Sequence, residues 1–341
     1  MLLPELSPAF VTAFSAAAIA TAKVFAMGAV GFFAVWRCWV SDEGLKAISA
    51  LVASITLPCL IFYRFALQFD PQEFPGWWKL TLLGAAMQVG AVIIGKIVSS
   101  RSKNHEMTLL IGYQNAGFFV LPMLQALLPS EEFGRAALML FVFIIFFNAS
   151  LWTAGSWFLL RKRELDFHAL FLRPPTVATA ASLLIFGVFH DFSHQFDAHF
   201  AFQILLGKIG ARGSAPGVLQ LIGDLTVPLA TLVLGGAIAQ MMRGGLANVS
   251  GKRAALEIAA WKLGILPLIG YLLLRFWPNS GLENDPTLRL LLMLQFAAPP
   301  AVNIAVFCQQ HNFPMRLTPT ACLVCYLLCI VTVPFWVALV M

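Results

Sequence analysis

A series of long apolar runs along nearly the whole length of 341 residues is the feature that most constrains this chain. A helix needs about 20 apolar residues to cross the hydrocarbon core of a bilayer. Ten runs reach roughly that length, and they cover residues 10–35, 46–68, 77–99, 107–128, 134–160, 174–190, 217–242, 254–277, 287–309 and 316–341. The sequence therefore predicts a polytopic membrane protein with about ten spans.

Composition favours helices over a soluble fold or a barrel. Hydrophobic residues make up 60% of the chain and charged residues only 11%, whereas soluble proteins carry about 25% charged residues. Lipid admits helices or closed barrels, and barrel strands would alternate apolar and polar residues. The unbroken runs predict an all-α fold. The net charge of +6 falls mainly in short loops, so we expect no nucleic-acid partner.

The distribution of Lys and Arg predicts the orientation of the spans. Thirteen of these residues lie in the loops after the odd-numbered runs, and seven lie on the opposite side. Because cytoplasmic loops carry the excess of positive charge, we expect both termini to be extracytoplasmic, with the protein in the cell (inner) membrane.

Two Thr-x-Pro motifs relate the two halves of the chain. Thr56 and Pro58 lie in the second run, and Thr226 and Pro228 lie in the seventh. Five spans in each half is an odd number, so the second half must be inverted across the membrane. We expect a first five-helix repeat over 1–162, a cytoplasmic linker over 163–173 and an inverted repeat over 174–341.

The fourth run of each half contains residues that interrupt a helix beside neutral amides. These residues are Gln114, Asn115, Gly117 and Pro122 in the first half and Gln295, Pro299, Pro300 and Asn303 in the second. Proline removes a backbone donor, and an opened helix N-terminus attracts anions. Paired breaks at matching positions are typical of a transporter's binding site. The pattern predicts that these residues and the Thr-x-Pro motifs bind a small carboxylate.

Four ionisable side chains fall inside the runs, where charge is costly and usually functional. Lys23 could attract an anion or pair with Asp224, and Asp224 could couple transport to a proton gradient. Lys262 could extend to the membrane surface or meet Glu257 in the same run. Lys23 and Asp224 are the candidates for charge or coupling.

Other motifs favour packing over chemistry. No Walker A or G-x-S-x-G pattern occurs, so we expect no enzyme, no cofactor and no metal. His190 and His194 have the spacing of a helical zinc site but lack the accompanying Glu. We expect an outward loop there, followed by an interfacial helix over 200–206. Cys322, Cys325 and Cys329 share a helical face and are expected to pack in the core.

Four segments together resemble the auxin efflux carrier family. "LKAISALVASITLPCLIFYRFAL" is similar to its second span, "NAGFFVLPML" to its fourth, "LIGDLTVPLATLVLGGAIA" to its seventh and "AAPPAVNIAVFCQQHN" to its ninth. They occur in the same order and cover nearly the whole chain. The short central loop resembles the compact bacterial branch.

The resemblance implies ten helices as two inverted five-helix repeats, with a scaffold or dimerisation domain, a transport domain and a homodimer. It implies that spans 4 and 9 cross at their breaks and bind an organic anion: auxin in plant members, malate- or malonate-like acids in many bacterial ones. Gln114 stands where plant carriers have a proline. Gln88 is the main polar residue of span 3, where they have an acid–lysine pair.

Alternatives share the broken helices. A sodium- or proton-coupled carrier of the bile-acid symporter or sodium–proton antiporter type would place oxygen ligands around an ion at the same depth. A membrane solute sensor would normally carry an appended signalling domain, and a membrane enzyme would need a polar catalytic cluster.

Overall fold

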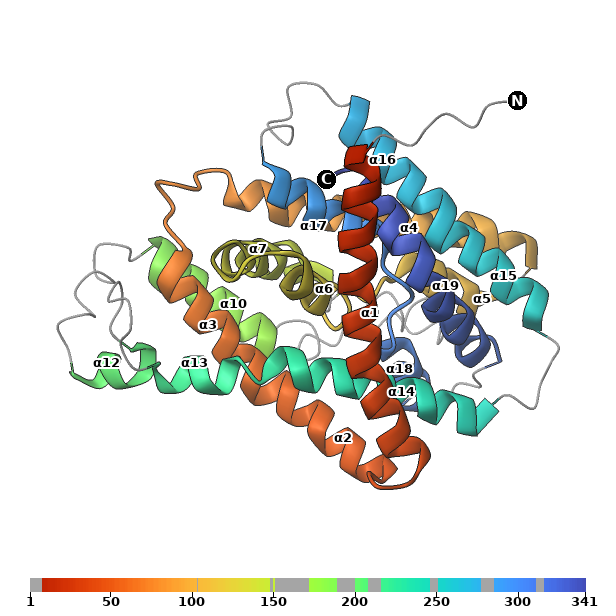
Figure 1. The fold of residues 1–341 in the computed structure, drawn as a ribbon, viewed down its shortest axis with the longest axis horizontal. Helices are drawn as coiled ribbons and strands as arrows, with labels where there is room; N and C mark the ends of the chain where they lie inside the picture. Colours follow the sequence, from red (N-terminus) through yellow and green to blue (C-terminus); the bar gives the residue numbers. More distant parts are fainter. Residues whose placement is uncertain are drawn as a thin grey trace.

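The computed structural model describes residues 8–102, 104–147, 150, 172–188, 200–207, 216–245, 251–276, 285–310 and 316–341. Within these ranges every regular element is a helix (Figure 1). The elements of the first half are α1 (Pro8–Trp36), α2 (Asp42–Leu51), α3 (Leu57–Gln68), α4 (Trp77–Ser102), α5 (His105–Gly112), α6 (Val120–Leu127) and α7 (Ser130–Phe143). Those of the second are α10 (Pro174–Leu183), α12 (Phe200–Leu206), α13 (Val218–Gly223), α14 (Thr226–Gly245), α15 (Lys252–Ala260), α16 (Leu266–Phe276), α17 (Pro286–Ala297), α18 (Asn303–Gln310) and α19 (Thr318–Ala338).

Six helices in the described residues are long and apolar enough to cross a membrane. They are Pro8–Trp36, Asp42–Gln68, Trp77–Ser100, Val218–Arg243, Lys252–Phe276 and Thr318–Ala338. The prediction of an all-helical polytopic membrane protein is confirmed at this level. The number of ten spans and the inverted arrangement stay predictions.

The other predicted spans take different forms. The fourth is divided into α5 and α6, and the ninth into α17 and α18. The fifth begins as α7 and runs into residues outside the described part. The sixth is a shorter apolar helix, Pro174–Val188. The helix predicted over 200–206 is present as α12, whereas His190, His194 and nearly all of the linker 163–173 lie outside the described residues.

Two long spans contain a π-helical turn immediately before a proline. The turn Val52–Thr56 joins α2 to α3 before Pro58, and the turn Trp261–Ile265 joins α15 to α16 before Pro267. A proline inside a helix cannot donate and clashes with the preceding turn. A widened turn relieves that clash, so each pair of helices continues as one rod (Figure 1).

The second Thr-x-Pro motif behaves differently from the first. The chain leaves the helix at Asp224 and Leu225, so Thr226 begins α14 and Pro228 falls in its first turn. First-turn amides have no partner within the helix, and a proline there is tolerated. We expected both motifs within apolar runs. The first lies inside one uninterrupted helical rod, whereas the second follows a two-residue turn within the long span Val218–Arg243.

The helices form two packing groups. One consists of α1, α2, α3, α10, α13 and α14, and we call it the α1/α14 group. The other consists of α4 to α7 and α15 to α19, and we call it the crossing group. The groups meet where α1 and α14 pack against α6 and α19, and where α3 packs against α7. This boundary passes beside the broken helices.

Small residues bring α1 and α14 together. A side chain on Gly235 would collide with the backbone of Gly28, and one on Gly31 would collide with the backbone of Leu232. Small residues allow helices in lipid to approach closely. Gly31 and Gly235 are therefore packing positions of this helix pair.

Candidate functional site

The two broken helices meet at their breaks. The chain is unwound over 113–119, between α5 and α6, and over 298–302, between α17 and α18. The unwound segments run antiparallel and form an isolated bridge between Gln114 and Pro300. We call this meeting point the crossing. It brings residues predicted from the fourth and ninth runs into direct contact.

The segments satisfy part of each other's backbone. Two hydrogen bonds join them, from Asn115 N to Pro299 O at 2.8 Å and from Ala301 N to Tyr113 O at 3.0 Å. Backbone groups freed from a helix at this depth must find partners within the protein or in a water-filled cavity. The crossing is therefore a stable element of the fold with a short piece of extended backbone at its centre.

Two side chains cap the C-terminal end of α5. Gln88 donates from Nε2 to Gly112 O at 3.0 Å, and the ammonium of Lys262 donates to Ile111 O at 3.0 Å. Both side chains are buried. The last carbonyls of a helix carry the negative end of its dipole. The chain thus neutralises this end with one amide and one cation of its own.

A tyrosine holds the key asparagine on another side of the crossing. Asn115 donates from Nδ2 to Tyr326 Oη at 2.7 Å, and the Tyr326 hydroxyl donates to Pro300 O at 3.2 Å. Tyr326 lies on α19, and both side chains are buried. This chain of hydrogen bonds ties the two unwound segments to α19.

Gln295 links α17 to the opposite break. Its Nε2 donates to Ala116 O at 3.2 Å, whereas its Oε1 is buried with no hydrogen-bond partner. A carbonyl can only accept, so the orientation of the amide is set by that bond. The unpartnered acceptor is a site for a donor from a ligand or a water.

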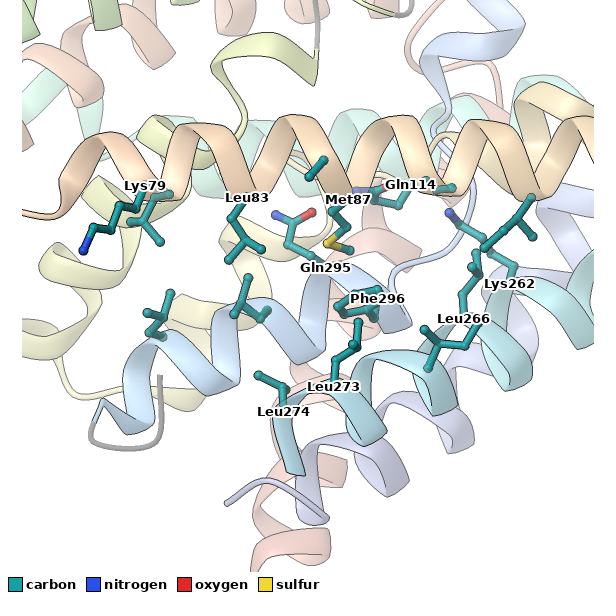
Figure 2. A pocket seen from close by; sticks show the side chains of 18 of the residues that line it. Lys79, Leu83, Met87, Gln114, Lys262, Leu266, Leu273, Leu274, Gln295 and Phe296 are labelled. Atoms are coloured by element: carbon teal, nitrogen blue, oxygen red, sulfur yellow. The ribbon is translucent and has the colours of Figure 1, made fainter. Parts of the chain in front are cut away.

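Two cavities lie beside the crossing. The larger, about 690 Å³, lies between α4, α16 and α17, and we call it the α4–α16 cavity. Figure 2 shows Gln114, Gln295 and Lys262 in its wall, with Lys79 at the far end. The smaller, about 360 Å³, lies between α1, α14 and the α6 and α19 side of the crossing. We call it the α1–α14 cavity.

The α1–α14 cavity is almost wholly apolar. Phe25, Phe119, Leu234 and Met242 contribute to its wall, and Tyr326 reaches it from α19. Phe119 is the residue immediately before α6, so the N-terminus of that half-helix opens toward this cavity. The cavity lies where the two packing groups meet.

The remaining residues predicted from the breaks occupy helix starts. Asn303 is the first residue of α18, and Pro122 lies in the first turn of α6. Gly117 lies in the unwound segment and accepts a hydrogen bond from Leu121 N. Pro122 therefore lies in the first turn of a helix, and the unwound segment 113–119 precedes it.

The Thr-x-Pro residues lie in the α1/α14 group, away from these hydrogen bonds. Thr56 and Thr226 are both buried, and the hydroxyl of each has no partner. Pro58 is half-buried and Pro228 is exposed. The hydrogen bonds of Asn115 within the described part of the chain go to Tyr326 and Pro299, and not to any of these four residues.

The charged candidates differ from their predictions. Lys23 and Asp224 are both exposed and form no ion pair with each other within the described part of the chain; Asp224 instead interacts electrostatically with Arg64 of α3. Lys262 was expected to reach the membrane surface or meet Glu257. That prediction is wrong, because Lys262 is 1% exposed and bonds to Ile111, whereas Glu257 is exposed.

Three residues at the crossing were missed as site residues: Gln88, Lys262 and Tyr326. Gln88 and Lys262 are polar groups within apolar runs, which is itself a signal of function in lipid. The apolar periodicity of their helices could not show that both side chains face α5. Tyr326 is surrounded by apolar residues in the last run, so no sequence pattern indicated that its hydroxyl would bind Asn115.

Comparisons with known proteins agree with the fold. The family model described as "Membrane transport protein" matches residues 16–179 and 170–337. PIN-LIKES 7 of Arabidopsis thaliana is 23% identical over 331 residues, which cover 80% of this chain and 83% of that protein. PIN-LIKES 5 of the same plant is 29% identical over 135 residues, which cover 39% of this chain and 33% of that protein.

The family match covers nearly all of the chain, and the long apolar helices fit it. Members of this family are transporters and not enzymes. The chain is an integral membrane protein that belongs to the membrane transport protein family of auxin efflux carriers.

Proposed function

We propose that this protein is a secondary transporter that carries a small organic anion by alternating access, with its transport site at the crossing. The anion is a mono- or dicarboxylate or an auxin-like weak acid. The observation that carries the proposal is the unequal treatment of the helix ends at the crossing. The negative end of α5 is capped by Lys262 and Gln88, whereas α6 and α18 begin there.

The half-helix N-termini favour an anion. The first amides of a helix lack intrahelical partners, and the dipole is positive at that end. The starts of α6 and α18 both lie at the breaks. Some first-turn amides are already bonded to the unwound segments, as Leu121 N is to Gly117 O and Ile304 N is to Ala301 O. A carboxylate there would therefore be held mainly by the positive end of each helix dipole.

Asn115 and Tyr326 are the side chains best placed to hold the carboxylate. Their mutual hydrogen bond keeps both groups satisfied when no substrate is present. An arriving carboxylate would accept from the Asn115 amide and the Tyr326 hydroxyl, while its apolar part occupies the α1–α14 cavity. Because that cavity lies between the packing groups, movement of the crossing group against the α1/α14 group would change its access.

The wider architecture belongs to the same proposal. Paired breaks and paired Thr-x-Pro motifs support ten spans as two inverted repeats, 1–162 and 174–341, joined by the linker 163–173. In this arrangement the α1/α14 group is the scaffold, and it pairs with a second copy as a homodimer. Both termini are extracytoplasmic, the protein lies in the cell membrane, and its compact central segment fits the bacterial branch.

The sodium-coupled alternative makes a different demand. Sodium needs several oxygen ligands, and carbonyls at half-helix C-termini commonly supply them. Here Ile111 O and Gly112 O already accept from Lys262 and Gln88. Uptake into proteoliposomes should therefore be the same in sodium and in choline buffer. A strict sodium requirement would favour the symporter instead.

Thermal unfolding of the purified protein against a panel of carboxylates tests the site. A ligand that binds the folded state and not the unfolded one stabilises it by RT ln(1 + [L]/Kd), so the true substrate should raise the Tm as its concentration increases. Asn115→Ala should abolish that rise and the uptake. Thr332→Val is the matched control, because that hydroxyl interacts with Leu328 O and the Cys329 thiol within α19 and not with the crossing. Equal stabilisation of wild type and Asn115→Ala would exclude the crossing as the transport site.

A further inference from the structure

The α4–α16 cavity is separate from the proposed transport site. It lies on the α4 and α16 side of the crossing, whereas Asn115 faces Tyr326 beside the α1–α14 cavity. Its volume of about 690 Å³ is within the range of ligand pockets, roughly 300–1,000 Å³. The proposed transport mechanism makes no use of this space.

A buried cation lies at one end of the cavity. Lys262 is 1% exposed, and among the described residues no carboxylate forms an ion pair with it. An ammonium has three donors, and the hydrogen bond to Ile111 O uses one. A buried charge without a counter-charge is costly. A bound anion would lower that cost.

Neutral hydrogen-bonding groups stand beside this cation. Figure 2 shows Gln114 and Lys262 at the same end of the cavity and the amide of Gln295 directed into it. The Oε1 atom of Gln295 is buried without a partner. Gln114 can donate to a carboxylate, whereas the Gln295 acceptor requires a donor. A carboxylic acid with a nearby hydroxyl satisfies both.

The rest of the cavity is apolar. Leu83 and Met87 of α4, Leu266 of α16, and Leu292 and Phe296 of α17 line it. It reaches the outer surface between α4 and α16, where its lining residues Ala86 and Leu273 are exposed. In a membrane that surface faces lipid. An aliphatic chain fits such a wall, whereas a second charged group has no partner along it until Lys79.

We propose that the α4–α16 cavity is a second binding site, which takes an amphipathic monocarboxylate from the bilayer. The carboxylate lies at Lys262 and Gln114, a hydroxyl near the head donates to Gln295 Oε1, and the aliphatic chain runs between α4 and α16. A single buried cation matches a single negative charge, which excludes short dicarboxylates, because their second charge would lie on the apolar wall between Lys262 and Lys79.

Direct binding to the full chain in phosphatidylcholine nanodiscs tests the proposal. The probes are 3-hydroxydecanoate, decanoate, decanol and decyltrimethylammonium, with affinity measured by titration calorimetry. The expected order places the hydroxy acid about threefold above decanoate, decanoate at least tenfold above decanol, and the cation without saturable binding. Binding of the cation as tight as that of decanoate, or no saturable binding of either acid, would overturn the proposal.

Two glycines supply a matched pair of variants that spare the charged and amide groups. A side chain at Gly90 meets nothing within 4 Å and would enter the cavity; one at Gly264 also meets nothing within 4 Å, but Gly264 does not line it. Gly90→Leu should weaken decanoate binding at least tenfold, and Gly264→Leu should leave it within twofold. Equal decanoate affinity in the two variants would show that decanoate does not bind in this cavity.

The head-group contact has its own test. Lys262→Met keeps the length of the side chain and removes its charge, so decanoate affinity should fall at least tenfold while decanol affinity stays unchanged. Lys79→Met, at the other end of the cavity, is the control and should bind as wild type. Asn115→Ala should abolish carboxylate transport and retain decanoate binding. If Asn115→Ala loses both transport and decanoate binding, the two proposed sites are one. If it retains both, the proposed transport site is wrong and the second site still stands.

Discussion

A buried side chain of opposite charge lies at each end of α5: Glu106 at its start, and Lys262, from the turn Trp261–Ile265, at its end. The two differ in how many hydrogen bonds they make. At its start, the carboxylate of Glu106 accepts hydrogen bonds from the backbone amides of Arg316, Leu317 and Thr318, and from the Thr318 hydroxyl at 2.6 Å. At its end, the ammonium of Lys262 makes one described hydrogen bond. These are the two charged side chains that are buried among the described residues.

The difference separates a buried charge whose hydrogen-bonding positions are all used within the protein from one that can still bind a ligand. Glu106 meets the N-terminus of α19, so its charge is matched by the helix dipole and its oxygens are saturated. Lys262 meets the carbonyl of Ile111 on one side and a cavity on the other. A saturated charge predicts a structural role, and an unsaturated one predicts a functional role.

Glu106→Ala should give the largest loss of stability. It leaves three backbone amides at the start of α19 without their acceptor, and breaking a buried charged network costs about 3–5 kcal/mol. Chemical unfolding in mixed micelles measures the change. Glu131→Ala, on the exposed first turn of α7, is the control and should cost less than about 1 kcal/mol. A small effect of Glu106→Ala would end the distinction between the two charges.

Lys262→Met should reverse that pattern. Replacing a buried charge by an apolar residue of similar size is often neutral or stabilising, so the unfolding free energy should change by less than about 2 kcal/mol. Carboxylate uptake should fall about tenfold, because the negative end of α5 is no longer neutralised beside the anion. Initial uptake rates per folded molecule measure this effect. A stability loss as large as that of Glu106→Ala would assign Lys262 to the fold.

Tyr326→Phe should have a smaller effect on the other side of the crossing. It removes one donor and the partner of Asn115, and a hydrogen bond of this kind contributes about 1 kcal/mol. The half-saturating substrate concentration should rise about fivefold, with a similar free-energy loss in stability. Tyr271→Phe on α16 serves as the control in the same uptake assay. Unchanged half-saturation in Tyr326→Phe would mean that Asn115 does not need this contact.

Much of the fold follows from residues that act along the chain. Apolar runs predict the long helices, and the prolines and glycine around Asn115 and Asn303 predict the breaks, because both depend on local backbone chemistry. The helix predicted over 200–206 formed as α12.

Partners across the chain were beyond local patterns. Lys262 and Gln88 lie 151 and 24 residues from the carbonyls that they cap, and Asn115 lies 211 residues from Tyr326. Periodicity assigns a residue to a helix face but does not identify the neighbouring element on that face. This is why Lys262 was expected beside Glu257, on its own helix, when its partner lies on α5.

The smallest expected effect concerns the buried hydroxyls of Thr56 and Thr226, which have no partner in this conformation. If they are only unsatisfied groups, Thr56→Val and Thr226→Val should leave the protein as stable or more stable by about 1 kcal/mol, since desolvation of a hydroxyl is then removed. Unchanged uptake would agree with that role. Reduced uptake with unchanged stability would contradict it, because each hydroxyl would then find its partner in another state of the transport cycle. That outcome would extend the comparison from charges to hydroxyls. A buried polar group without a hydrogen-bond partner would then indicate a position that binds a ligand or gains a partner in another conformation.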